Sequence, residues 1–326
     1  MLATSPAAAQ SRADTSVRFS LDSRIDGTAA PVFQAIDRGY FGHERLAVTV
    51  EPAATRREPL TRVASGDYPL GFADINALIR FRDANPEAPV KAVFIVYNRP
   101  PYAVVGRKSR GVAVPKDLEG RRLGAPADDV TYAQWPLFAK AAKIDIEKVK
   151  VENIGAPVRV PMLAAGQVDA LTGFSFTTAL DLKDRGVPEN DITVMAMADY
   201  GLDLYGHAII VNTKFAAEEP QAVRAFLRAY LRGLKDAVKS PGSAIAGVIR
   251  RAEGAQRQLE LERLTMAMRD NVATPEVRAN GYGGIDAARF ARALEQLSSI
   301  HKYKTPPKAE DIFDDTLLPT AAERRF

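Results

Sequence analysis

The chain contains no cysteine among its 326 residues. This absence excludes disulfide bonds, thiolate nucleophiles and cysteine-ligated metal ions. Histidine is scarce as well, because only His43, His207 and His301 are present, so zinc sites and serine–histidine–aspartate catalysis are poorly supplied. We therefore expect a protein without catalytic residues, bound metal or cofactor.

Long hydrophobic runs and blocks of one charge are also missing. No apolar run approaches the roughly 20 residues of a membrane-spanning helix. The 44 basic and 40 acidic residues give a net charge of +4, but they are interspersed, which argues against nucleic acid as a partner. The sequence does have 46% hydrophobic residues, which is enough for the cores of two domains in a chain of this length.

The first 16 residues are small and polar. Within them, residues 5–10 resemble the end of a secretory signal, with alanines at the cleavage site, but the hydrophobic core of such a signal is missing. We interpret residues 1–16 as the remnant of a truncated signal peptide, with a disordered tail as the alternative. The remnant predicts an exported, periplasmic protein.

Hydrophobic patterning in the first third of the chain alternates between strands and helices. Alternating or continuous apolar residues predict four strands, at residues 17–21, 46–50, 70–73 and 90–96. Helices fall between them, and the first, at residues 30–38, ends at Gly39. The run at 90–96 is almost unbroken, as in strands that helices cover on both faces. This region is therefore predicted to be an α/β unit with a mostly parallel sheet.

A second α/β unit follows the first. Its strands are predicted at residues 103–106, 122–125, 149–154, 169–172 and 192–196. A further strand is predicted at residues 208–211, and from Pro220 onward the chain changes to long amphipathic helices.

Two breaks in the pattern predict that the chain crosses between two lobes. The first is at residues 97–102, where adjacent prolines cannot continue a central strand, and the second is at residues 199–206. We expect lobe one to comprise residues 17–101 and 205–326, and lobe two residues 102–204. Two crossings make a hinge, and a ligand is expected in the cleft between the lobes.

The stretch at residues 112–133 is predicted to organise the second unit. Residues 115–120 are typical of a helical turn closed by glycine, residues 122–125 of a strand, and residues 128–131 of the polar cap of a helix. Such a junction leaves unpaired N–H groups and the positive end of a helix dipole facing one point. The junction suits a polar or anionic small molecule, although an ordinary βα connection has the same pattern.

Four segments carry a resemblance to a known family. They are AIDRGYF at residues 35–41, SGDYPLGFAD at 65–74, VPKDLEGRRLG at 114–124 and LAAGQVDA at 163–170. In these segments and in their order, the chain resembles the periplasmic solute-binding proteins of ABC importers. The branch that it resembles includes sulfonate, taurine and nitrate receptors and the thiamine-pyrimidine-precursor (NMT1/THI5-like) proteins. The resemblance extends from Val17 to about Pro319.

The resemblance implies a two-lobe periplasmic-binding-protein fold of type II, in which each lobe is a mostly parallel sheet flanked by helices. It implies a receptor that captures a small solute and presents it to a membrane permease. We expect this receptor to be a monomer. Two alternatives are an enzyme similar to the thiamine-pyrimidine synthase on the same fold and a ligand-sensing domain. The synthase carries a cysteine-rich motif that this chain lacks, and a sensing domain would require an attached DNA-binding or membrane segment.

Candidate ligand-binding residues lie at predicted strand ends, at the two crossings and near the start of a helix in lobe two, because binding sites concentrate in cleft loops. They are Asp22, Ser23, Arg24, Asp74, Ile75, Asn76, Tyr97, Asn98, Arg99, Asp128, Thr131, Tyr132, Trp135, Phe174, Ser175, Tyr200, Tyr205 and His207.

The residue types among these candidates indicate the chemistry of the solute. Aromatic residues are frequent at the predicted cleft edges, which suits a ring-bearing solute that stacks. The arginines near the cleft, Arg24, Arg99 and Arg159, suit an aromatic carboxylate or a sulfonate, because guanidinium pairs with planar anions. The aspartates among the candidates suit a pyrimidine instead, because they accept hydrogen bonds from ring amino groups. The sequence leaves these solute classes open.

Overall fold

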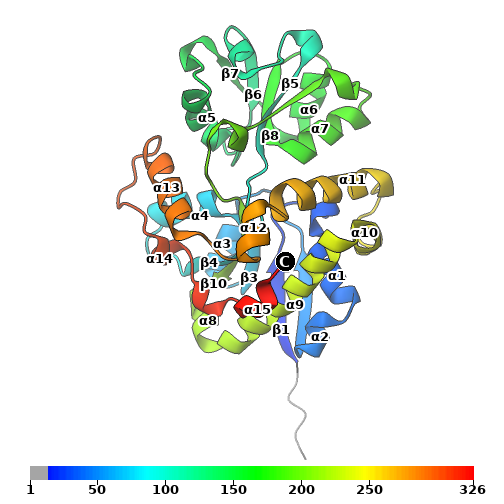
Figure 1. Cartoon of the computed structure of the whole chain (residues 1–326), viewed down its shortest axis with the longest axis vertical. Helices are drawn as coiled ribbons and strands as arrows, with labels where there is room; N and C mark the ends of the chain where they lie inside the picture. The colour runs from blue at the N-terminus through cyan, green and yellow to red at the C-terminus, as the bar shows by residue number, and fades with distance from the viewer. Residues whose placement is uncertain (1–13) are drawn as a thin grey trace, which may run out of the picture.

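Two five-stranded sheets organise the computed structural model, which describes residues 14–326 (Figure 1). Each sheet is the framework of one lobe, and the two lobes lie one above the other along the long axis of the molecule. The predicted signal remnant lies outside the described residues except for its last three. Thr15 and Ser16 are not part of a tail, because they pair with Leu46 and Ala47 in the first sheet.

The first sheet has the strand order β2-β1-β3-β10-β4. Its strands are β1 (Thr15–Ser20), β2 (Leu46–Glu51), β3 (Leu70–Asp74), β4 (Val90–Ile95) and β10 (His207–Asn212). Strand β1 pairs in parallel with β2 and β3, whereas β10 is antiparallel to β3 and β4. We call the part of the protein built on this sheet the first lobe.

The second sheet has the order β7-β6-β8-β5-β9 and repeats this pattern. Its strands are β5 (Tyr102–Arg107), β6 (Arg122–Ala125), β7 (Lys150–Asn153), β8 (Ala170–Phe174) and β9 (Ile192–Ala196). Strand β6 pairs in parallel with β7 and β8, and β5 is antiparallel to β8 and β9. The part built on this sheet is the second lobe.

One strand in each sheet runs against the other four, so the prediction of mostly parallel sheets holds for four strands out of five. The reason is the path of the chain. Strand β4 ends where the chain crosses to the second lobe, and β5 and β10 are the first strands that the chain forms after a crossing. Because both crossings enter a lobe at its cleft edge, β5 and β10 must run away from the cleft.

Most of the helices belong to the first lobe. They are α1 (Ala30–Asp37), α2 (Tyr40–His43), α3 (Glu58–Ser65), α4 (Ile75–Ala84), α8 (Thr213–Glu218), α9 (Pro220–Lys239), α10 (Pro241–Ile249), α11 (Arg257–Ala267), α12 (Pro275–Asn280), α13 (Ala287–Ser298), α14 (Ala309–Ile312) and α15 (Ala321–Arg324). The predicted apolar stripe of α9 packs on the sheet, where the ring centroid of Phe226 lies 5.2 Å from that of Phe19 on β1. Within the part of the chain that the structure describes, no helix combines the length and the apolar character of a membrane span.

The second lobe has three α-helices, and one of them contacts the first lobe. They are α5 (Trp135–Ala141), α6 (Ala156–Ala164) and α7 (Ser175–Asp184). Helix α7 lies next to α11 at the boundary of the lobes (Figure 1). Here Nη2 of Arg263 lies 3.0 Å from Oδ1 of Asp181, and Nζ of Lys183 lies 2.8 Å from Oε1 of Glu262. The lobes are therefore in direct contact on this side.

Candidate ligand-binding site

A cleft lies between the two sheets. It contains a cavity of about 510 Å³ that both lobes line, with Asp22, Arg24 and Arg56 from the first lobe and Asp129 and Arg159 from the second. A neighbouring cavity of about 610 Å³ lies between α6, α7 and the segment that joins α10 to α11, and Arg24 and Arg159 line both cavities. The cleft is therefore large enough for a small organic molecule.

Asp22 is the charged centre of the first-lobe wall. It follows β1, its side chain is 7% exposed, and its Oδ2 lies 3.0 Å from Nε2 of the buried His207 on β10. The guanidinium of Arg56 donates a hydrogen bond to the same oxygen. Arg56 belongs to the loop at residues 52–57, which joins β2 to α3. One carboxylate therefore connects a strand end, the start of another strand and a loop.

The surroundings of Asp22 keep its carboxylate ionised. Burial by itself raises the pKa of Asp22, but the positive charge of Arg56 and the neighbouring imidazole of His207 hold that pKa well below its usual value. Burial lowers the pKa of Arg56, and the charges of Asp22, Asp129 and Asp26 outweigh this effect and raise it. The Asp22–Arg56 pair is therefore an ion pair at neutral pH.

Aromatic rings surround the imidazole of His207. The ring centroids of Phe72, Tyr97 and Phe174 lie 4.9, 5.4 and 5.4 Å from its centroid. Phe174 is the last residue of β8, so this aromatic group contains rings from both lobes. The Cζ atom of Arg56 lies 3.9 Å from the centroid of the Phe174 ring. An aromatic face of the second lobe and a carboxylate of the first lobe therefore meet at one guanidinium.

Polar side chains at the hinge side of the cleft bond to one another. Asp74 ends β3 and caps α4, because its Oδ1 accepts from the N–H of Ala77 at 2.8 Å. The hydroxyl of Tyr102 donates to Asp74, and burial together with the charge of Asp74 raises the pKa of Tyr102 well above its usual value. Nδ2 of Asn76 donates to the Tyr102 hydroxyl and to the carbonyl of Tyr205, both at 2.7 Å. These contacts join the first lobe to the beginning of β5 and to the second crossing.

Asp129 and Arg159 form an ion pair on the second-lobe wall. Their charged atoms lie 3.0 Å apart, and the side chains are 8% and 11% exposed. Asp129 also accepts from the N–H groups of Thr131 and Tyr132, at 2.8 and 3.0 Å. The polar cap predicted to begin at Asp128 is therefore formed by Asp129, one residue later, and the side chain of Asp128 is exposed. Within residues 14–326, no three histidine, aspartate or glutamate side chains are grouped closely enough to bind a metal ion.

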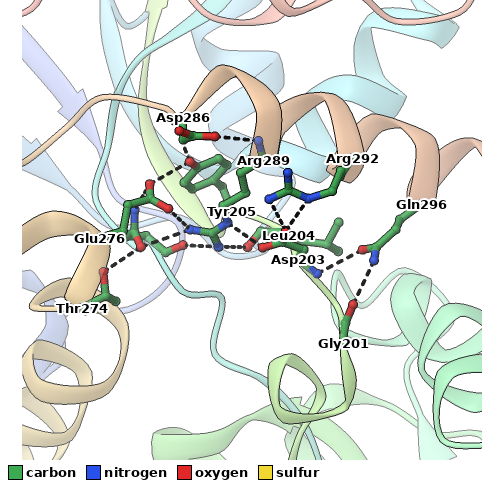
Figure 2. Close-up of polar contacts among 11 residues, drawn as sticks. Gly201, Asp203, Leu204, Tyr205, Thr274, Glu276, Asp286, Arg289, Arg292 and Gln296 are labelled. Carbon is green, nitrogen blue, oxygen red and sulfur yellow. Dashed lines mark hydrogen bonds and ion pairs between the residues drawn. The ribbon is translucent and has the colours of Figure 1, made fainter. Parts of the chain in front are cut away.

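The two hinge crossings are fastened to the C-terminal helices by Arg289 of α13 (Figure 2). Its guanidinium donates to the carbonyl of Asn98 in the first crossing, at 2.8 Å, and to the carbonyl of Leu204 in the second, at 2.7 Å. It also forms ion pairs at 2.9 Å with Asp203 and with Glu276 of α12. One side chain therefore holds both crossings in place.

The structure brings several of the predicted site residues to the cleft. Those that line the 510 Å³ cavity are Asp22, Ser23, Arg24 and Asp128. Those that surround His207 or bond to one another at the hinge are Asp74, Asn76, Tyr97, Phe174 and Tyr205. For all of these residues, contact with a solute stays a prediction.

Other predicted residues lie elsewhere. Asn98 and Arg99 line a separate cavity of about 330 Å³ beside the C-terminal helices. Trp135 is 1% exposed and packs beside Phe138, at 6.1 Å between ring centroids, in the core of the second lobe. Five predicted residues remain. Ile75 and Thr131 are buried, whereas Tyr132 and Ser175 are half-buried. Tyr200 is half-buried as well, with its ring edge-on to that of Phe138.

Sequence reasoning missed Arg56, Asp129 and Arg289. Arg56 follows the predicted strand at 46–50, so the rule that selected Asp22 after the first strand would have selected this loop also. Arg289 offers no comparable signal, because it lies on an amphipathic helix and contacts a residue 191 positions away, Asn98.

The sequence of the chain is similar to those of a known family of proteins. The sequence model described as NMT1/THI5 like matches residues 27–244, about two thirds of the chain. The chain belongs to the NMT1/THI5-like family. The chain is 26% identical over 304 residues to the formylaminopyrimidine-binding protein of Halalkalibacterium halodurans. The aligned residues cover 91% of the chain and 89% of that protein. It is 24% identical over 295 residues to the riboflavin-binding protein RibY of Chloroflexus aurantiacus, covering 89% of the chain and 82% of that protein.

Two further comparisons extend the family relationship. The NMT1/THI5-like chain is 23% identical over 221 residues to the 4-amino-5-hydroxymethyl-2-methylpyrimidine phosphate synthase of Schizosaccharomyces pombe, covering 65% of the chain and 62% of that enzyme. Its fold is similar to that of the alkanesulfonate-binding protein SsuA of Xanthomonas axonopodis pv. citri bound to MOPS. The TM-score is 0.69 at 15% identity, covering 93% of the chain and all of that structure. The predicted family and the predicted two-lobe fold are thereby confirmed.

Proposed function

We propose that this protein is the solute-binding receptor of an ABC importer, which captures a small ring-bearing solute outside the cytoplasm and presents it to a membrane permease. One observation carries the proposal: Asp22 of the first lobe and Phe174 of the second contact the same two side chains, Arg56 and His207. A solute that binds this carboxylate and this ring touches both lobes, so its binding free energy favours the closed arrangement of the lobes.

Closure in this proposal is a movement of two rigid parts. Residues 17–101 and 205–326 form one part and residues 102–204 the other, with the hinge in the two crossings. A monomer is sufficient, because both walls of the cleft come from one chain.

An aminopyrimidine is the solute class that we favour. A carboxylate next to an aromatic face suits a flat ring that bears amino groups, because the amino N–H groups donate to the carboxylate while the ring stacks. The names of two relatives, the formylaminopyrimidine-binding protein and the aminopyrimidine phosphate synthase, support this class. A sulfonate is less favoured, because Asp22 already neutralises Arg56 and Asp129 already neutralises Arg159.

The proposal is tested by adding defined solutes to the purified chain. The set contains formylaminopyrimidine, riboflavin, benzoate and MOPS, and the measurements are the melting temperature and the heat of binding. We expect formylaminopyrimidine to raise the melting temperature by mass action and benzoate and MOPS to leave it unchanged. Stabilisation by benzoate or MOPS alone would instead show that the receptor binds an anion, and stabilisation by riboflavin alone would show that it binds a flavin.

The second candidate function is an enzyme similar to the pyrimidine phosphate synthase. The observation that favours it is His207, which is fully buried with its Nε2 at 3.0 Å from Asp22 and its Nδ1 at 3.7 Å from Asp74. The absence of cysteine from the sequence argues against it, because the related synthase type carries a cysteine-rich motif. Mass spectrometry of the protein and the bound solute after incubation separates the two functions. We expect both masses to be unchanged, and any stoichiometric conversion would establish the enzyme.

A further inference from the structure

The guanidinium of Arg56 lies where two kinds of contact meet. One of its nitrogens donates to Oδ2 of Asp22, and its Cζ lies 3.9 Å from the centroid of the Phe174 ring. The group is thus held at its edge by a carboxylate of one lobe and on its face by an aromatic ring of the other. The guanidinium is flat and consists of conjugated N–C–N units whose N–H groups point outward in the plane.

The Arg56 guanidinium has hydrogen-bonding capacity that the described part of the protein does not use. Among residues 14–326, the only hydrogen bond of the Arg56 side chain is the one to Asp22, although a guanidinium has five N–H donors. The side chain of Arg56 is 22% exposed and lines the 510 Å³ cavity. By contrast, Arg289 at the hinge forms four hydrogen bonds to protein groups. Arg56 is therefore held by the site but is not fixed by a surrounding network.

An aminopyrimidine matches the same two contacts. The exocyclic amino group, the ring carbon that bears it and the adjacent ring nitrogen form an N–C–N edge, and the protonated edge presents two parallel N–H groups to a carboxylate as guanidinium does. The flat ring supplies the face for Phe174. The ionised state of Asp22 suits this pairing, and Nε2 of His207 lies 3.0 Å from the same carboxylate independently of Arg56.

We propose that Arg56 occupies the subsite for the N–C–N edge of the solute, and that solute and Arg56 compete for Asp22 and Phe174. This inference rests on the proposed function and adds two statements to it. The first statement is that the solute is a flat ring with an amidine-like N–C–N edge. The second is that Arg56, a residue of the receptor itself, weakens the binding of this solute.

The displaced guanidinium has other acidic partners in the cleft. Asp26 and Asp129 lie close enough for their charges to act on Arg56. Asp129 is on the second lobe and already pairs with Arg159, so a rotated Arg56 side chain would share this carboxylate across the cleft. The loop at residues 52–57 is held at its base, where the N–H of Ala53 donates to Ser23 and that of Ala54 to Glu58, so the exchange requires movement of the side chain only.

The competition predicts opposite effects for the two partners of the ion pair. Arg56→Ala removes the competitor, so we expect it to tighten the binding of formylaminopyrimidine about fivefold, because the subsite is no longer partly occupied. Asp22→Asn removes the charge that both groups require, and we expect it to weaken binding at least about tenfold. Arg38→Ala is the matched control, because Arg38 is an exposed arginine at the end of α1, outside the cleft. Isothermal titration calorimetry measures all three.

A second probe tests the subsite without the natural solute. Methylguanidinium has the same charged group as the Arg56 side chain that Arg56→Ala removes. We expect about 10 mM methylguanidinium to raise the melting temperature of Arg56→Ala by about 2 °C. The melting temperatures of wild type and Arg38→Ala should not change. Tetramethylammonium has the same charge but no N–H group, so it should not stabilise Arg56→Ala. The double variant Arg56→Ala/Asp22→Asn should not respond to either cation.

The outcomes separate the two proposals. Weaker or unchanged binding of formylaminopyrimidine by Arg56→Ala would overturn the proposed competition. Weaker binding would show that Arg56 contacts the solute favourably, and unchanged binding would show that the solute binds elsewhere. Stabilisation of Arg56→Ala by methylguanidinium, with no binding of any aminopyrimidine, would support the subsite and overturn the proposed solute. Failure of methylguanidinium to stabilise Arg56→Ala would overturn the subsite even if aminopyrimidine binds.

Discussion

The guanidinium of Arg289 lies over the ring of Tyr205, with its Cζ 4.0 Å from the ring centroid. Tyr205 is in the second hinge crossing, and its hydroxyl donates to Glu276 at 2.8 Å and accepts from the N–H of Asp286 at 2.8 Å (Figure 2). Asp286 is also the cap of α13, because its Oδ1 accepts from the N–H of Arg289 at 2.7 Å. The start of α13 and the second crossing therefore form one hydrogen-bonded unit.

This unit predicts a large cost for the loss of Arg289. Its side chain is 12% exposed, and Arg289→Met leaves Glu276 and Asp203 without their shared cation. We expect the free energy of unfolding, measured by urea denaturation, to fall by about 3 kcal/mol. Arg292→Met is the control, because Arg292 pairs with the same Asp203 but is 56% exposed, and we expect it to lose at most about 1 kcal/mol. Equal losses in the two variants would contradict the role of Arg289 in the hinge.

The close approach of the two crossings at Gly206 gives a second prediction. A Cβ atom at this position would lie 2.9 Å from Cβ of Tyr97 and 3.0 Å from Cα of Pro100, while the Gly206 N–H donates to the Tyr97 carbonyl at 2.8 Å. Gly206→Ala forces the crossings apart, so we expect it to lower the free energy of unfolding by about 1–3 kcal/mol. Gly242→Ala in α10 has open space around the added atom and should stabilise the protein by up to about 1 kcal/mol. Thermal denaturation of both variants checks the contrast.

Trp135 gives a third prediction, because it is the only tryptophan and is 1% exposed. We expect its fluorescence to be blue-shifted and resistant to quenching by acrylamide, and Trp135→Ala to lower the free energy of unfolding by about 3–5 kcal/mol. Val114→Ala, at a site that is 52% exposed, should change it by less than about 0.5 kcal/mol. The sequence-based prediction that Trp135 also stacks on the solute requires Trp135→Phe to weaken binding. Lower stability with unchanged affinity would contradict that role.

The ion pair of Asp22 predicts a dependence of stability on pH. Its pKa in the folded protein lies below the value of an unfolded aspartate, so its stabilising contribution is complete above the unfolded pKa and is lost as the pH falls toward the folded pKa. The difference in unfolding free energy between wild type and Asp22→Asn should therefore be constant above about pH 5 and shrink below about pH 4. A difference that grows on acidification would contradict the assigned direction of the pKa shift.

Much of the fold could be predicted from local patterns. The strand predicted at 122–125 has the bounds of β6. The strand predicted at 17–21 differs from β1 by two residues at its start and one at its end, and the strand predicted at 46–50 differs from β2 by one residue at its end. These predictions succeeded because burial on one or both faces of a sheet requires apolar residues at regular positions. The helix stop at Gly39 was predicted for the same kind of local reason, since its φ of +68° favours glycine.

The sequence alone determined the two α/β units, the two crossings and the family, because periodicity, glycine and proline positions and short motifs act over a few residues. Tertiary structure alone decided which strand ends meet. Asp22, Arg56, Phe174 and His207 come from four separate segments, and only the pairing of β10 with β3 and the contact of the lobes bring them together. It also decided that Trp135 is buried and that Arg289 holds both crossings. Such contacts depend on the packing of whole elements, which no local pattern in the chain records.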